Sequence, residues 1–215
     1  MENRRNLRGQ TIASIRMLAA IIPRHTKTME EEIKKDIANY FLSDSRQFLS
    51  RYEILKPTQT EISNRSKLLI DIVFSFECSL KALIFIESEL DERETYKTVR
   101  KCGHNLRNLI QVVDTSKIAD IISVIDENFD HFSVGSRYTL DANIYFRNSA
   151  GALDNLYYST IANFNWLETL YQNSKKLYLY VNSKIDNSIK TISFGDIDVE
   201  KELEKTRRIK QLNQK

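Results

Sequence analysis

The sequence predicts an all-α protein, and three observations support this. The 215 residues include only 5 glycines and 2 prolines, whereas β-sandwiches and doubly wound α/β folds draw on both at turns and phosphate loops. Hydrophobic residues make up 41% of the chain and charged residues 28%, which is the balance of a protein with a buried core. Apolar residues also recur at three- and four-residue spacing over long stretches, as they do in amphipathic helices.

The N-terminal segment, residues 1–57, predicts a helical arm that packs on the rest of the chain. Residues 11–22 predict a short helix that ends at Pro23, and residues 29–55 predict a second one. A break is expected at Ser43-Asp44-Ser45, because such side chains compete with the backbone for hydrogen bonds.

Residues 59–90 predict the central helix of the core. Thr58-Gln59-Thr60-Glu61 has the form of a capping box, in which the Thr58 hydroxyl and the Glu61 carboxylate satisfy backbone N–H groups at a helix start. The apolar residues that follow form a wide stripe, typical of a helix surrounded by others. They are Ile62, Leu69, Ile72, Val73, Phe76, Leu80, Leu83, Ile84 and Ile86.

After this helix, residues 93–100 predict a partly helical connection that ends at Gly103, and Asn105 is suited to cap the next helix. Asp114-Thr115-Ser116 restarts a helix with isoleucines at helical spacing. A loop is expected over 131–140, followed by a last core helix that ends near Gln172. Together these elements predict a four- to five-helix bundle over residues 58–173.

Part of the C-terminal extension, residues 174–215, fits two kinds of secondary structure. Residues 177–181 could extend the last core helix or form a short strand, and residues 193–196 predict a turn. Residues 199–214 are charged and only loosely periodic, which indicates a marginal terminal helix.

The cysteine content predicts a cytoplasmic protein, whereas the charge is less decisive. The formal net charge of +3 permits nucleic-acid binding through a local patch without requiring it. Cys78 and Cys102 form no CxxC pair and are expected to be free thiols. Arg16 interrupts the apolar run near the N-terminus, and charged residues interrupt the longest one, so neither export nor a membrane span is expected.

The sequence excludes several kinds of site. It has no Walker loop, no GxGxxG motif and no GxSxG nucleophile elbow. The three histidines, His25, His104 and His131, are scattered, whereas zinc needs three or four converging ligands. We therefore expect no bound metal and no cofactor.

Three pieces of sequence occur in a suggestive order. A long apolar helix carries Lys81, Gly103-His104-Asn105-Leu106 follows about twenty residues later, and Ser136-Arg137-Tyr138 leads into the last core helix. This order resembles a subgroup of the HEPN superfamily (higher eukaryotes and prokaryotes nucleotide-binding), and the resemblance covers about residues 60–172. It implies an all-α bundle, a homodimer, and an RNA-linked role in prokaryotic stress or phage defence, including toxin–antitoxin systems.

Catalytic HEPN proteins are metal-independent endoribonucleases with an arginine, often followed by a polar residue, and a histidine a few residues further on. Arg147-Asn148 supplies the opening pair here, but Ala152, Leu153 and Asp154 stand where the histidine belongs. Arg100 and His104 are the nearest match, with Gly103 between them. In such a site arginine binds the scissile phosphate and histidine transfers a proton.

The resemblance assigns candidate roles. Arg100 and His104 are the candidate catalytic residues, and the candidate binding residues are Lys81, Asn105, Arg137, Tyr138, Arg147 and Asn148. Structural roles remain open: His104 could hydrogen-bond a polar partner in the core, and Lys81 could reach the surface or pair with Glu77 one turn earlier.

The predicted function is that of a non-catalytic or divergent HEPN-like protein that binds or acts on RNA or a nucleotide, with a possible protein partner encoded nearby. The alternatives are an active metal-independent endoribonuclease toxin and a purely protein-binding helical scaffold.

Overall fold

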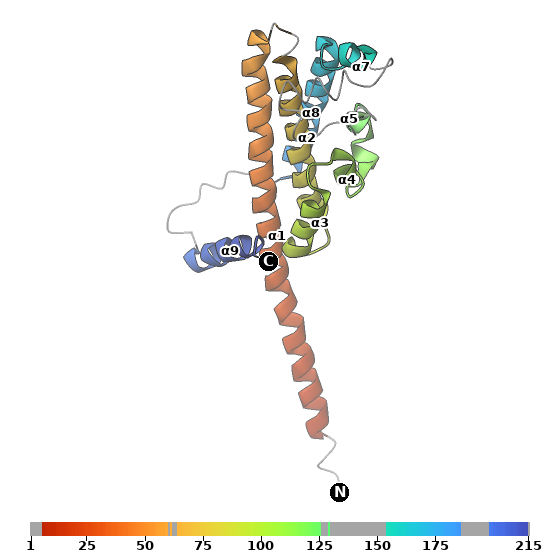
Figure 1. Cartoon of the computed structure of the whole chain (residues 1–215). Coiled ribbons are helices and arrows are strands. Elements are labelled where there is room, and N and C mark those ends of the chain that lie inside the picture. The colour runs from red at the N-terminus through yellow and green to blue at the C-terminus, as the bar shows by residue number, and fades with distance from the viewer. Residues whose placement is uncertain are drawn as a thin grey trace. The chain divides into compact units, whose positions relative to one another are not determined.

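A computed structural model describes residues 6–59, 61, 64–125, 129, 154–185 and 198–214, and only the backbone of residues 6–28 and 154–156. These ranges contain eight α-helices and no strand, so the predicted all-α class is confirmed (Figure 1). The helices are α1 (Asn6–Leu55), α2 (Arg65–Glu87), α3 (Glu92–Cys102), α4 (Leu106–Ile110), α5 (Ala119–Ile122), α7 (Asp154–Ser159), α8 (Phe164–Lys184) and α9 (Val199–Gln211). None of them has both the length and the apolar character that crossing a bilayer requires.

The chain forms two compact units. One comprises Ile37–Ile189, and the other comprises Met1–Asp36 with Lys190–Lys215. This division differs from the predicted segments 1–57, 58–173 and 174–215. The reason is that the C-terminal part of α1 and the whole of α8 pack against α2.

The α1 helix continues through both positions where the sequence predicted an interruption. Pro23 lies inside it, although a proline in a helix interior costs about 3 kcal/mol. Strong helix formers flank the proline on both sides, Leu18-Ala19-Ala20 before it and Glu30-Glu31-Glu32 after it. The expected break at Ser43-Asp44-Ser45 is also absent, because the Ser45 hydroxyl bonds to α2 instead of to its own backbone: its Oγ donates to the Ser75 carbonyl at 3.1 Å.

The α2 helix is the centre of the Ile37–Ile189 unit, as predicted. Phe76 and Leu80 have no exposed surface, and 17 of the 23 residues of α2 are buried. The predicted start of this helix at residue 59 is wrong, however. Thr58 belongs to a 3₁₀ turn, η1 (Lys56–Thr58), and its hydroxyl donates back to the Leu55 carbonyl at 2.8 Å. Pro57 stands at the start of this turn, so Thr58 does not cap α2, which begins at Arg65.

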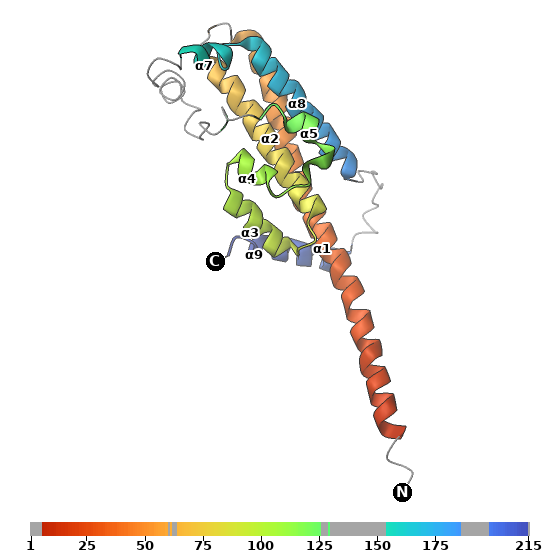
Figure 2. The same ribbon diagram turned by 90° about the vertical axis from the view of Figure 1, so that its right-hand side faces the viewer.

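Three helices of this unit, the C-terminal part of α1, α2 and α8, lie side by side (Figure 2). Phe48 on α1 packs on Phe74 of α2 with ring centroids 5.2 Å apart. Tyr52 on α1 stacks on Tyr171 of α8 at 4.3 Å. The same three helices share a cluster of four buried serines, joined by hydroxyl–hydroxyl bonds of 2.8 to 2.9 Å: Ser45, Ser75, Ser79 and Ser174.

The α3 helix is longer than the partly helical connection predicted over residues 93–100. The Asp91 carboxylate accepts from the Glu94 N–H at 2.8 Å and so caps the start of α3. The helix ends at Gly103, whose φ of 61° lies in the left-handed region that glycine tolerates best. Asn105 then caps α4 by accepting from the Asn108 N–H at 3.0 Å, as predicted.

The last core helix extends further than predicted. It is divided into α7 and α8, and Asn163 caps the start of α8 by accepting from two backbone N–H groups. Leu177 and Val181 are fully buried on the same face as Leu170, so residues 177–181 extend the helix and form no strand. The predicted loop 131–140 and turn 193–196 lie outside the described residues.

The other compact unit contains the predicted terminal helix. This helix, α9, is capped by Asp198 and runs alongside acidic side chains of α1. Lys201 pairs with Glu32 at 2.7 Å, and Lys205 pairs with Asp36 at 3.2 Å. Ion pairs are therefore a main part of the contact between α9 and α1.

Candidate functional site

Glu77 is a buried carboxylate on α2, and it organises the most distinctive polar cluster of the Ile37–Ile189 unit. Its side chain is 5% exposed, and it stands among the apolar residues of the core helix. Lys81, one turn later, donates from Nζ to Glu77 Oε1 at 2.6 Å. The alternative in which Lys81 pairs with Glu77 is therefore confirmed, and this pairing offsets the charge of a carboxylate that would otherwise be costly to bury.

His104 contacts the same carboxylate from the turn that follows α3. Its Nδ1 lies 3.0 Å from Oε1 and 3.1 Å from Oε2 of Glu77. Because a carboxylate only accepts hydrogen bonds, Nδ1 is the donor in this contact. His104 is nevertheless 61% exposed, so its Nε2 is the nitrogen left to meet a ligand. A carboxylate that fixes one nitrogen of a solvent-facing imidazole also fixes its tautomer and its orientation.

The backbone at Gly103 makes this contact possible. The left-handed φ of Gly103 ends α3, and the chain turns so that His104 meets α2. Phe74 on α2 lies beside the imidazole, with ring centroids 6.4 Å apart. Three features therefore position His104: the end of α3, the turn at Gly103 and the neighbouring ring of Phe74.

Basic side chains line the exposed face of α3. Arg93, Lys97, Arg100 and Lys101, which we call the α3 basic stripe, stand at positions i, i+4, i+7 and i+8 and are all exposed. Such spacing places them on one face of a helix. Residues 93–107 contain five basic residues, the four of the stripe and Arg107, against one acidic residue, Glu94, which pairs with Lys97 at 2.6 Å. The segment is thus strongly basic although the whole chain is nearly neutral.

Arg100 and His104 do not form a joined pair. Within the described ranges no hydrogen bond connects them, and the Arg100 guanidinium lies 5.9 Å from the centre of the Tyr96 ring. The Gly103 turn separates the two residues although they are four positions apart. Arg100 therefore belongs to the α3 basic stripe, and His104 belongs to the Glu77 cluster at the end of that stripe.

The other residues that the sequence predicted for binding are either engaged in contacts within the protein or lie outside the described residues. Asn105 uses its side chain to cap α4. Lys81 is 12% exposed and is engaged by Glu77, and it also lies 5.8 Å from the centre of the Phe41 ring. Arg137, Tyr138, Arg147 and Asn148 lie outside the described residues.

Sequence reasoning missed two features of this site. The contact between Glu77 and His104 joins residues 27 positions apart, and no local pattern indicates it. The α3 basic stripe did have a signal, which is the helical spacing of its four cations. It was missed because the sequence predicted only a partly helical connection over residues 93–100.

Among the side chains that the structure describes, no group of three or more His, Cys, Asp or Glu residues could hold a metal ion. No family model matches the chain, and no curated protein or solved structure is significantly similar to it. The resemblance to HEPN proteins therefore stays a prediction from the sequence.

Proposed function

We propose that this chain is a divergent HEPN-like protein that binds RNA or a nucleotide through the α3 basic stripe, with His104 at the end of the binding surface. The exposed stripe is the observation that carries the proposal. Arg93 and Lys101 are eight residues apart, so the stripe is about 12 Å long at the rise of an α-helix. This length is sufficient for more than one phosphate of a nucleic-acid strand.

His104 supports an RNA-binding role because Glu77 fixes Nδ1 as the donor, and in that tautomer Nε2 is an acceptor suited to a ribose 2′-hydroxyl or a base N–H. With Nδ1 donating to Glu77, Nε2 is directed to a ligand without further ordering of the ring, which lowers the entropic cost of contact. Tyr96, half-buried beneath Arg100, adds an aromatic ring beside the stripe. Aromatic rings next to cations are a recurring arrangement in proteins that bind single strands.

The proposal is tested by RNA binding at two salt concentrations. We expect the affinity of the full chain for a single-stranded RNA, measured by fluorescence anisotropy, to fall steeply between about 50 and 200 mM salt. The variant Arg100→Ala/Lys101→Ala should bind more weakly and should reduce the slope of log affinity against log salt by about 1 to 2. The matched control is Lys175→Ala/Lys176→Ala, which removes two exposed cations from α8 and should bind as the unchanged protein does.

Two results would contradict the proposal. Equal effects of the two double variants would mean that binding follows overall charge instead of the stripe. A complex that is insensitive to salt would favour the alternative of a protein-binding scaffold, since phosphate contacts release counterions. Circular dichroism of each variant checks that the helices are retained.

The active endoribonuclease is a second candidate, favoured by the hydrogen bond between Glu77 and His104. A carboxylate that orients a histidine is the arrangement expected of a general acid or base. In a catalytic protein, metal-free cleavage of RNA should fall by about 10²–10⁴ on His104→Ala. Arg100→Ala and Arg147→Ala identify the phosphate-binding arginine. Cleavage that survives His104→Ala would exclude this residue as the proton carrier.

We also propose that the protein is a cytoplasmic homodimer, as the HEPN resemblance implies. A symmetric dimer would present the α3 basic stripe twice. Light scattering at micromolar concentration should give about twice the chain mass of 25.2 kDa. A mass of one chain would contradict the dimer but would leave the RNA-binding test unaffected.

A further inference from the structure

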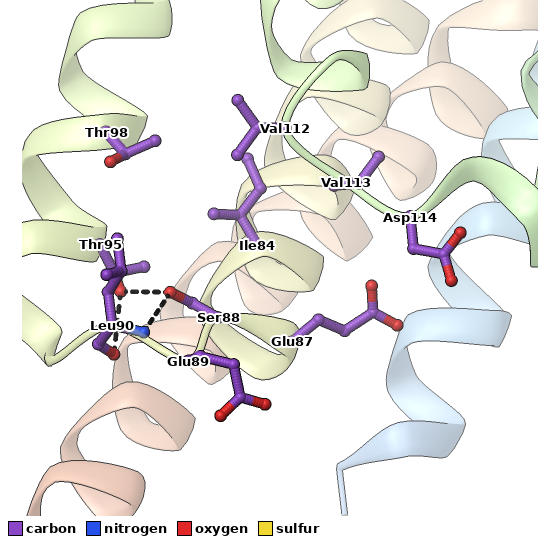
Figure 3. A pocket seen from close by; sticks show the side chains of 10 residues that line it. All are labelled: Ile84, Glu87, Ser88, Glu89, Leu90, Thr95, Thr98, Val112, Val113 and Asp114. Carbon is purple, nitrogen blue, oxygen red and sulfur yellow. Dashed lines mark hydrogen bonds between the residues drawn. The ribbon is translucent and has the colours of Figure 1, made fainter.

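A cavity of about 380 Å³ lies between the C-terminal end of α2, the N-terminal part of α3 and the chain after α4 (Figure 3). Its volume is within the range of pockets that hold small molecules. Ten residues line it: Ile84, Glu87, Ser88, Glu89, Leu90, Thr95, Thr98, Val112, Val113 and Asp114. None of them belongs to the α3 basic stripe or to the Glu77 cluster, so this cavity is a separate feature.

The lining combines an aliphatic wall with carboxylates. Ile84, Leu90, Val112 and Val113 supply the aliphatic wall, and Glu87, Glu89 and Asp114 supply three carboxylates, whereas none of the ten residues is Lys, Arg or His. In Figure 3 the Glu87 side chain extends from α2 toward the side where Asp114 stands. An anionic ligand such as a phosphate would be repelled here, and a cation would be attracted.

Glu87 has one carboxylate oxygen in use and one without a partner. Its Oε1 accepts from Lys184 at 2.7 Å, whereas its Oε2 is buried and has no hydrogen-bond partner. A buried carboxylate oxygen without a partner is costly, so a turn of the Glu87 carboxyl group toward a donor bound in the cavity would be favourable. Lys184 pairs with Glu87, and the charges of Lys117 and Lys184 also act on Asp114, so two lysines stand against the three carboxylates and a net negative charge remains around the cavity.

The remaining walls of the cavity are held in place. The Ser88 hydroxyl lies 2.8 Å from the Thr95 hydroxyl and accepts from the Leu90 N–H at 3.2 Å, which ties the end of α2 to α3. Asp114 accepts from the Ser116 N–H at 3.0 Å, and this hydrogen bond lowers the pKa of Asp114 below its ordinary value. The cavity is thus formed before any ligand binds, and Asp114 is negatively charged at neutral pH.

We propose that this cavity binds a small organic cation, an amine whose ammonium group faces the carboxylates of Glu87, Glu89 and Asp114, and whose alkyl or aromatic body lies against the aliphatic wall. The two parts of the ligand follow from the two parts of the lining. This inference is independent of the proposed RNA binding, because it uses other residues and the opposite charge.

The test compares three probes of related shape by amide NMR spectra of the full chain. Hexylammonium carries both the charge and the apolar body, 1-hexanol lacks the charge, and ammonium chloride lacks the body. We expect hexylammonium to shift the amides of the lining residues and to bind about tenfold more tightly than either other probe, since a charge-assisted hydrogen bond adds to the apolar contact. Equal binding of 1-hexanol, or shifts elsewhere on the protein, would overturn the proposal.

Two variants locate the site. Glu87→Gln/Glu89→Gln removes two charges but leaves Asp114 as the cap of its turn, and it should weaken hexylammonium binding about tenfold. Thr98→Met keeps every charge but fills the cavity, and it should abolish binding. The control Asp120→Asn removes an exposed carboxylate of α5 that does not line the cavity, and it should leave binding unchanged. Unchanged binding in either of the first two variants would overturn the proposal, and RNA binding should be the same in all three.

Discussion

Replacing Glu77 by leucine should destabilise the protein strongly, because the change removes the partner of a nearly buried lysine. The Lys81 side chain is 12% exposed and its Nζ lies 2.6 Å from Glu77 Oε1. Removing one member of a buried ion pair leaves the other charge without compensation and costs about 3–5 kcal/mol. His104 adds little to this figure, because a side chain that is 61% exposed returns to water easily.

The double variant Glu77→Leu/Lys81→Met tests the cause of this loss. It replaces both charges by apolar groups of similar volume, and such replacements of buried pairs are often neutral or stabilising. We therefore expect the double variant to recover most of the stability that the single variant loses. Glu77→Gln is a milder control, because its amide oxygen can still accept from Lys81.

The measurement is urea unfolding followed by far-UV circular dichroism, with thermal unfolding beside it. For a chain of this length each kcal/mol shifts the thermal midpoint by about 2–4 °C, so Glu77→Leu should lower it by about 6–20 °C. A double variant as unstable as Glu77→Leu would refute the reasoning, since the loss would then come from packing of the leucine and not from the unpaired lysine.

The remaining predictions concern the core. Leu80→Ala should lower the free energy of unfolding by about 2–5 kcal/mol, because Leu80 is fully buried; a loss below 1 kcal/mol in urea unfolding would contradict its place in the core. Burial raises the pKa of Tyr52 and of Tyr171 above the ordinary value. Above about pH 10 these tyrosines therefore lose their protons in the unfolded state while they keep them in the folded state. The free energy of unfolding should then fall as the pH rises. This alkaline loss, measured by urea unfolding at a series of pH values, should shrink in Tyr52→Phe/Tyr171→Phe; an equal loss in the variant would contradict the assignment to these tyrosines. Burial raises the pKa of the Cys78 thiol to about 12 and also raises that of Cys102. A thiol reagent at neutral pH should therefore label both cysteines only after denaturation. Rapid labelling of the native protein would contradict this prediction.

The sequence indicates the helices of this protein better than their ends. The stripe of α2 is long and wide enough to be recognised from spacing alone. Ser45 shows why an interruption was predicted wrongly in α1: a serine that competes with its own backbone and one that bonds to Ser75 of another helix look the same in the sequence. Thr58 shows why the start of α2 was also predicted wrongly. The sequence around it has the form of a capping box, but Pro57 draws Thr58 into a 3₁₀ turn.

The candidate site is predictable in part for a related reason. The pairing of Lys81 with Glu77 lies within one turn of one helix, and the spacing suggests it. The contact of His104 with Glu77 depends on how α3 returns to α2 after Gly103. That direction is a property of packing, which the spacing of residues along the chain does not contain.

The attachment of α9 to α1 by ion pairs has a consequence for how this unit responds to its surroundings. Lys201 and Lys205 hold α9 to acidic side chains of α1, while Val199 and Leu203 are 62% and 59% exposed and add little burial. The Debye length shortens from about 10 Å at 0.1 M to about 3 Å at 1 M salt. The terminal helix should therefore loosen from α1 at salt concentrations that leave the aromatic and aliphatic core of the Ile37–Ile189 unit intact, and amide exchange in α9 would then report the ionic strength around the protein.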